Sequence, residues 1–202
     1  GAVVACSVVG NVEVYARVHE ATGRMRACSC INLGRPVEDI DACIQDAVGF
    51  TPPCSRAWAY NAINDSEHWG KDDYWATPLQ TLTSNGGDCE DFSIAKYFTL
   101  IEMGVPAERL RLTYVKALEL DQAHMVLTYY ETPEAEPVVL DNLVGEIRPS
   151  SQRTDLLPVY SFNGEGLWLA KTRTGNDKHV GHSSRLGPWR DVIARISDEY
   201  TR

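Results

Sequence analysis

The sequence contains no long apolar run and no cluster of basic residues. None of its hydrophobic stretches approaches the roughly 18 to 20 residues that a helix needs to cross a membrane, so we expect no membrane insertion. Its 28 acidic residues outnumber its 19 basic ones, and the net charge of −9 is spread along the chain. Nucleic-acid binding requires clustered Lys and Arg. The composition therefore excludes a nucleic-acid partner, whereas its acidity suits a cation.

Internal repeats and low-complexity tracts are also missing. A chain of 202 residues with 44% hydrophobic content can bury one core and leaves little room for a second domain. We expect a single domain over residues 1–202. Within it, residues 1–65 show few patterns, and residues 172–202 are expected to form a polar loop and a terminal helix.

Cysteine spacing argues against zinc. The six cysteines include no Cys-x-x-Cys pair, and Cys28 and Cys30 are separated by one residue rather than by the two to four that are typical of zinc sites. If Cys89 is a free nucleophile, the other five cannot all pair within one molecule. Residues 1–6 resemble the end of a lipoprotein signal, but the apolar stretch before Cys6 is too short. We interpret it as ordinary sequence.

A buried helix is indicated around Cys89. Residues 84–87 form a turn, and Asp88 is a candidate N-cap with Asp91 three residues further on. Apolar residues then recur at helical spacing over 92–101. The spacing therefore places Cys89 in the first turn of this helix.

Strands are predicted after that helix. Three β-rich segments cover 110–115, 124–130 and 138–144, residues 131–137 form the turn between the last two, and 160–169 predicts a further hairpin. These elements predict an α+β fold, in which the helix bearing the nucleophile packs on an antiparallel sheet. Weaker signals indicate a strand at Val8, Val12 and Val14 and helical pieces over 37–48 and 79–83. We expect a mobile polar segment over 171–187. A terminal helix follows, with Trp189, Val192, Ile193 and Ile196 on one face.

The position of Cys89 favours nucleophilic chemistry. A free thiol keeps its proton until about pH 8.5, and the thiolate is the reactive form. At a helix N-terminus the unpaired N–H groups favour the anion and can also form an oxyanion hole. A neighbouring imidazolium favours the thiolate further.

His124 and Asp141 can supply that imidazole and orient it. Pairing the two strands about Pro133 places His124 and Asp141 opposite each other within a residue or two. The sequence therefore predicts a papain-type triad of Cys89, His124 and Asp141. A single buried cysteine is usually inert and a lone strand histidine is usually structural, but their combination with a helix start and a hairpin-placed Asp favours catalysis.

The carboxylates beside Cys89 predict a calcium site. Asp88 and Glu90 should raise the pKa of the thiol by like-charge repulsion, and Ca²⁺, which binds hard carboxylate oxygens, would neutralise them. Asp91 is the third candidate metal ligand. The alternative carries equal weight: Asp88 caps the helix, while Glu90 and Asp91 interact with its dipole.

The motifs resemble those of the bacterial transglutaminase-like cysteine peptidases. The resemblance runs from about Trp69 to Lys171 and departs from the family over residues 1–65. The segments that carry it are 73–78, 87–92, 94–98, 112–116, 122–127 and 140–142.

The resemblance implies a transglutaminase-like domain and a Ca²⁺-dependent periplasmic cysteine endopeptidase with Cys89, His124 and Asp141 as its triad. It implies Asp88 and Glu90 as the first calcium ligands to consider. The implied substrate is the N-terminal region of a large biofilm adhesin, whose cleavage releases the adhesin from the cell surface. The implied inhibitor is the periplasmic domain of a membrane cyclic-di-GMP receptor.

Two other functions use the same residues. An acyltransferase or transglutaminase would use the same triad, and a calcium-binding interaction domain would retain the site without catalysis. Trp75 and Asn85 are candidates to line the cleft, with ordinary packing favoured for Trp75. We expect His68, His179 and His182 to be surface or loop residues.

Overall fold

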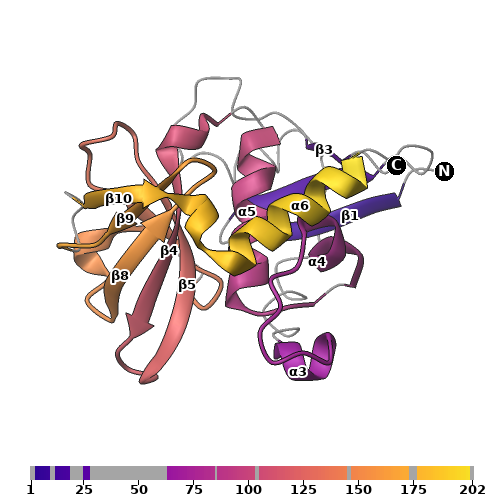
Figure 1. Ribbon diagram of the computed structural model, residues 1–202, viewed down its shortest axis with the longest axis horizontal. Helices are drawn as coiled ribbons and strands as arrows, with labels where there is room; N and C mark the ends of the chain where they lie inside the picture. Colours follow the sequence, from indigo (N-terminus) through magenta and orange to yellow (C-terminus); the bar gives the residue numbers. More distant parts are fainter. Residues whose placement is uncertain are drawn as a thin grey trace.

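The computed structural model describes residues 3–9, 12–18, 25–27, 63–84, 86–102, 105–144, 147–172 and 177–200. It shows helices packed on an antiparallel sheet (Figure 1), as the sequence predicts. The helices are α3 (Asp65–His68), α4 (Pro78–Ser84), α5 (Cys89–Glu102) and α6 (Gly187–Tyr200). Within the described ranges, no helix is long and apolar enough to cross a membrane.

The large sheet has seven strands in the order β10-β9-β8-β4-β5-β6-β7, and every pairing is antiparallel. The central strands pair along their full length, from Leu110 opposite Tyr129 to Ala117 opposite Gln122. This rigid pair presents the first residues of β5 at one end of the sheet. The strands are β4 (Leu110–Ala117), β5 (Gln122–Tyr129), β6 (Val138–Leu140), β7 (Arg148–Pro149), β8 (Leu156–Phe162), β9 (Gly166–Leu169) and β10 (Lys178–His182). In the described ranges, short 3-10 turns cover Ala107–Arg109, Ser150–Gln152 and Ser183–Arg185.

One hydrophobic core joins α5 and α6 to this sheet. Phe162 of β8 is fully buried and contacts Trp75, 5.7 Å away between ring centroids, and Trp189 of α6, 5.2 Å away. Burying side chains of this size contributes about 1.5–3 kcal/mol each, so the core fixes α5 against the sheet. Its other buried members include Ile94, Tyr97, Leu100, Leu110, Leu112, Met125, Leu127, Leu140 and Val192.

The N-terminal strands form a separate sheet in the order β1-β2-β3. β1 (Val3–Val9) and β2 (Val12–Val18) are antiparallel, with Val9 opposite Val12, and β3 (Met25–Ala27) pairs with β2. The β-structure expected at Val8, Val12 and Val14 is therefore confirmed, but as two antiparallel strands rather than one. The helix predicted over 37–48 and the side chains of the five N-terminal cysteines lie outside the described part of the chain.

Three predictions about the sheet and the last helix are wrong in detail. The third strand ends at Leu140 rather than at Val144, because beyond Leu140 the chain leaves its pairing with β5. The segment over 171–187 includes β10, which pairs with β9 at the sheet edge, so it is not simply a mobile loop. Ile193 was expected on the buried face of α6 but is 38% exposed, whereas Trp189 and Val192 of the same helix are buried.

Candidate active site

Cys89 is the first residue of α5, where the sequence places it. The turn before it is tight: Gly87 has φ +154°, and a Cβ there would lie 2.6 Å from Asp91 Oδ2. Glycine is needed at this position because a side chain could satisfy neither the backbone angle nor the space. The turn therefore delivers Cys89 directly into the helix start.

The backbone of one residue of β5, Met125, holds α5 against the sheet. Ser93 Oγ, one turn after Cys89, donates to the Met125 carbonyl oxygen at 3.0 Å. The Met125 backbone N–H hydrogen-bonds the sulfur of Cys89. Met125 directly follows His124 in β5, so these two contacts bring the cysteine and the histidine to the same place.

His124 and Asp141 form a buried pair. His124 Nε2 lies 2.8 Å from Asp141 Oδ1, which is the cross-strand contact that the hairpin predicts. Asp141 lies just beyond β6 and also accepts hydrogen bonds from the Leu143 backbone N–H at 3.0 Å and from Arg153 Nη2 at 2.7 Å. Burial alone would raise the pKa of Asp141, but the hydrogen bonds and charges of His124 and Arg153 hold it well below its usual range. Asp141 is therefore ionised. Because it contacts Nε2 of His124, the other ring nitrogen, Nδ1, can face another group.

Cys89 and His124 line the same open cleft, which has a volume of about 700 Å³. One wall is aromatic, with Tyr114 and Tyr160 stacked at 5.0 Å between centroids. Another wall is acidic. The remaining lining residues include Asp65, Asp72, Asp73, Trp75, Asp88, Glu90, Gln122, Ala123, Met125, Asn142, Leu143, Leu186 and Pro188.

The thiol of Cys89 is held in its protonated form by its surroundings. Its Sγ donates a hydrogen bond to Glu90 Oε2 at 3.0 Å. Burial raises the pKa of Cys89 most, and the carboxylates of Glu90 and Asp88 raise it further, while the Met125 N–H acts in the opposite direction. Without a positive charge near the carboxylates, this cysteine is a poor nucleophile at neutral pH.

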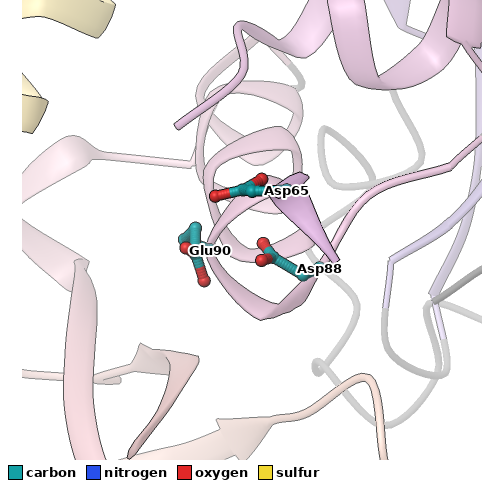
Figure 2. Close-up of side chains that lie close together, drawn as sticks. All are labelled: Asp65, Asp88 and Glu90. Atoms are coloured by element: carbon teal, nitrogen blue, oxygen red, sulfur yellow. The ribbon is translucent and has the colours of Figure 1, made fainter. Parts of the chain in front are cut away.

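Asp65, Asp88 and Glu90 form an acidic cluster beside the thiol. Figure 2 shows the three side chains close together at the start of α5, and one carboxylate oxygen from each lies within 4.8 Å of the others. Asp65 Oδ1 and Asp88 Oδ1 are buried without a hydrogen-bond partner. Burial first, and then the charges of Glu90, Asp91 and Asp65, raise the pKa of Asp88. Three converging hard oxygen donors with two unsatisfied atoms fit a calcium ion.

Asp65 was not predicted from the sequence. It lies 24 positions before Cys89 in α3, and only the folded chain brings the two segments together. Asp65 Oδ2 accepts a hydrogen bond from the Tyr74 backbone N–H at 2.5 Å, which fixes the loop that follows. The signal available in the sequence was an acidic residue at the N-terminus of a short helix, which alone does not indicate a site.

Asp91 lies apart from this cluster. Its Oδ1 accepts from the Ala76 backbone N–H at 2.7 Å, and its Oδ2 accepts from Trp69 Nε1 at 3.2 Å. Burial raises the pKa of Asp91 to about 7 despite these two donors. The structure therefore shows Asp91 tying the 69–76 loop to α5, rather than completing a capping box or joining Asp88 and Glu90.

α6 anchors the loop that carries the acidic wall. Arg195 Nη1 donates to the Tyr74 hydroxyl at 2.6 Å, and Arg195 Nη2 donates to the Trp75 carbonyl oxygen. Thr77 Oγ1 donates to Glu199 Oε1 at 2.8 Å. The last helix thus determines where the 74–77 segment lies, although it contributes only its first residues to the cleft.

The other predicted residues take ordinary positions. Trp75 packs in the core and also borders the cleft, whereas Asn85 lies outside the described residues. His68 Nε2 lies 2.8 Å from Ser84 Oγ. His179 and His182 are exposed on β10, consistent with surface roles.

Comparison with known families identifies the chain. The profile of the bacterial transglutaminase-like cysteine proteinases (BTLCP) matches residues 57–168, more than half of its length. The chain belongs to this family. Among proteins with curated descriptions, none matches it. The match includes Cys89, His124 and Asp141 and the acidic cluster of Asp65, Asp88 and Glu90.

Solved structures of LapG from Legionella pneumophila resemble this BTLCP chain. The EGTA-treated form is 54% identical over 62% of this chain and 66% of that chain, with a TM-score of 0.57. A further LapG structure is 53% identical over 62% of this chain and 64% of that chain, with a TM-score of 0.56. The calcium-bound form is 39% identical over 82% of this chain and 95% of that chain, with a TM-score of 0.59. In the first two comparisons, the matched part spans slightly less than two thirds of the LapG chain.

Proposed function

We propose that this protein is a calcium-dependent cysteine endopeptidase. The observation that carries the proposal is one cleft lined both by Cys89, at the start of α5, and by His124, which is hydrogen-bonded to Asp141. Membership of a cysteine proteinase family supports the same reaction class. The catalytic roles of these three residues are part of the proposal.

The proposed reaction begins with a proton transfer from Cys89 Sγ to His124 Nδ1. The thiolate attacks a substrate carbonyl carbon, and the backbone N–H groups at the start of α5 stabilise the resulting oxyanion. The His124 imidazolium gives its proton to the leaving amine, and water then hydrolyses the thioester. Asp141 holds the imidazole in the required tautomer and stabilises its charged form.

Asp65, Asp88 and Glu90 are the residues proposed to hold calcium. A bound Ca²⁺ would supply positive charge against the carboxylates that keep the Cys89 thiol protonated. The existence of calcium-bound and EGTA-treated forms of Legionella pneumophila LapG supports this assignment. Asp91 is not assigned to the ion, because both of its oxygens accept N–H donors elsewhere.

The proposed substrate is the N-terminal region of a large biofilm adhesin, which cleavage would release from the cell surface. The proposed location is the periplasm, and the proposed inhibitor is the periplasmic domain of a membrane cyclic-di-GMP receptor. These statements rest on the family resemblance. An open cleft about 700 Å³ in volume, large enough for an extended peptide, is compatible with a protein substrate.

The proposal is tested by cleavage of N-terminal adhesin fragments with and without chelator. We expect cleavage by the wild type in calcium, none in chelator, and none by Cys89→Ala, which should fold normally. Undiminished cleavage by Cys89→Ala would refute the nucleophile, and full activity in chelator would remove calcium from the mechanism.

Two further arms separate the alternative functions. An excess of a primary amine during the reaction would give amide adducts with a transferase, whereas a protease gives free termini. Alkylation of Cys89 by iodoacetamide should be faster in calcium than in chelator. An alkylation rate equal to that of an ordinary thiol in both conditions would favour a calcium-binding domain without catalysis.

A further inference from the structure

The second oxygen of Asp141 is held by a buried arginine from the turn before β8. Arg153 Nη2 donates to Asp141 Oδ2 at 2.7 Å, opposite the oxygen that contacts His124. The Arg153 and Asp141 side chains are 3% and 1% exposed. A charge-assisted hydrogen bond with this degree of burial is among the stronger contacts available to a carboxylate.

Arg153 is itself fixed in orientation. Its Nε lies 2.9 Å from Asp155 Oδ1, and its Nη2 lies 2.7 Å from Asp155 Oδ2. Its backbone N–H donates to the Ser150 carbonyl oxygen at 3.2 Å, and its carbonyl oxygen accepts from Leu156 at 3.1 Å. The Arg153 guanidinium therefore approaches Asp141 from a rigid turn, and its two hydrogen bonds to Asp155 fix the plane of the guanidinium group.

This contact matters because Asp141 lies one residue beyond the end of β6. The pairing of β6 with β5 ends at Leu140, so the sheet does not fix the Asp141 backbone. The fully buried Lys96 of α5 steadies the preceding residue, since its Nζ lies 3.4 Å from the Leu140 carbonyl oxygen. Arg153 and the Leu143 N–H are the groups that fix the carboxylate itself, apart from His124.

We infer that Arg153 is a positioning residue of the active site, which holds the Asp141 carboxylate toward His124 and is itself oriented by Asp155. The inference rests on the proposed function, because it assigns Arg153 to the same His–Asp pair. Arg153 does not line the catalytic cleft. It acts through Asp141 alone.

The test compares Arg153→Met with Arg111→Met. Arg111 is a matched control: it is a largely buried arginine of the same sheet, paired with Asp177 at 3.2 Å, and it does not line the catalytic cleft. Each variant loses a buried ion pair and keeps a long side chain, and Arg153→Met also loses the pair with the partly exposed Asp155. Arg153→Lys keeps the charge but cannot reach Asp141 and Asp155 together, so it should recover part of the activity.

We expect Arg153→Met to lower kcat about 10- to 100-fold with KM within about twofold of wild type, in line with the loss of a group that orients a catalytic residue. Arg111→Met should keep kcat. Asp155→Asn is a milder change, because Asp155 is partly exposed and contacts Arg153 rather than Asp141. It should lower kcat less than Arg153→Met. It keeps the inference testable if Arg153→Met does not fold.

A spectroscopic readout separates this inference from the proposed function. The proton on His124 Nε2 should give a downfield NMR resonance, assigned by its loss in His124→Asn. It should persist in Arg111→Met and shift upfield or broaden in Arg153→Met. An unchanged resonance with wild-type kcat in Arg153→Met would overturn the inference, as would equal losses in both arginine variants. If the wild type cleaves no protein, the proposed proteolysis fails, and the resonance still decides the role of Arg153.

Discussion

Asp65→Asn should stabilise the calcium-free protein while weakening its response to calcium. The amide keeps an oxygen that can accept the Tyr74 N–H bond and removes one negative charge from a cluster whose oxygens lie within 4.8 Å of one another. Two like charges at that distance repel by about 3.5 kcal/mol at an effective dielectric of 20 and by about 0.9 kcal/mol in water. The raised pKa of Asp88 lowers the share of that carboxyl that is ionised, so we count the pair with Glu90 only.

The expected gain in chelator is therefore about 1–3 kcal/mol. For a chain of this size, that gain raises Tm by about 2–12 °C. In calcium this gain is offset, since removing a charged ligand should weaken calcium binding about 10- to 100-fold. At a calcium concentration 100 times the wild-type Kd, the wild type gains about 2.7 kcal/mol, and the variant gains about 0.4 to 1.4 kcal/mol.

Thermal unfolding followed by circular dichroism in chelator and in calcium measures both effects. Asp72→Asn is the control, because Asp72 is an exposed carboxylate of the same cleft outside the cluster. It should change neither value by more than about 0.5 kcal/mol. A lower Tm of Asp65→Asn in chelator, or a calcium shift equal to that of the wild type, would refute the reasoning.

Three further predictions follow from the buried charges. Asp141→Asn should lower kcat about 10³- to 10⁴-fold, because the amide favours the wrong imidazole tautomer; a loss below tenfold in a steady-state assay would contradict its role. In chelator, the free energy of unfolding should fall as pH rises from about 4 to about 7. The pKa of Asp91 is about 7 in the folded state and 3.8 in the unfolded chain, so the folded state binds one more proton in this range. Urea titrations that show a constant or rising stability across this range would contradict the prediction. Burial lowers the pKa of Lys96 to about 8 from 10.5, so stability should rise by up to about 3 kcal/mol between those values. Lys96→Met should abolish that slope, and a slope that persists in the variant would assign it to another group.

The local parts of the site could be predicted from the sequence. The helix start at Cys89 follows from a glycine turn and helical spacing, and the contact between His124 and Asp141 follows from strand pairing about one turn. Both depend on residues that are close in the chain or related by one hairpin. Periodicity and pairing rules act over such distances.

The parts that depend on long-range folding could not be predicted. Asp65 reaches the cluster through the path of the loop after α3, and Arg153 reaches Asp141 from the turn before β8. Neither has a pattern that distinguishes it from an ordinary surface residue. Asp91 was grouped with Asp88 and Glu90 because it is near them in the sequence, yet the helix turns its carboxylate toward Ala76.

The backbone of Met125 sets the spacing between the two reacting groups. Its N–H contacts the sulfur of Cys89 and its carbonyl accepts from Ser93, so both hydrogen bonds are made by backbone atoms of β5. The buried side chain at position 125 takes no part in either bond. Sliding of the helix along the strand would break both bonds together, so the catalytic distance is protected against shear by the main chain.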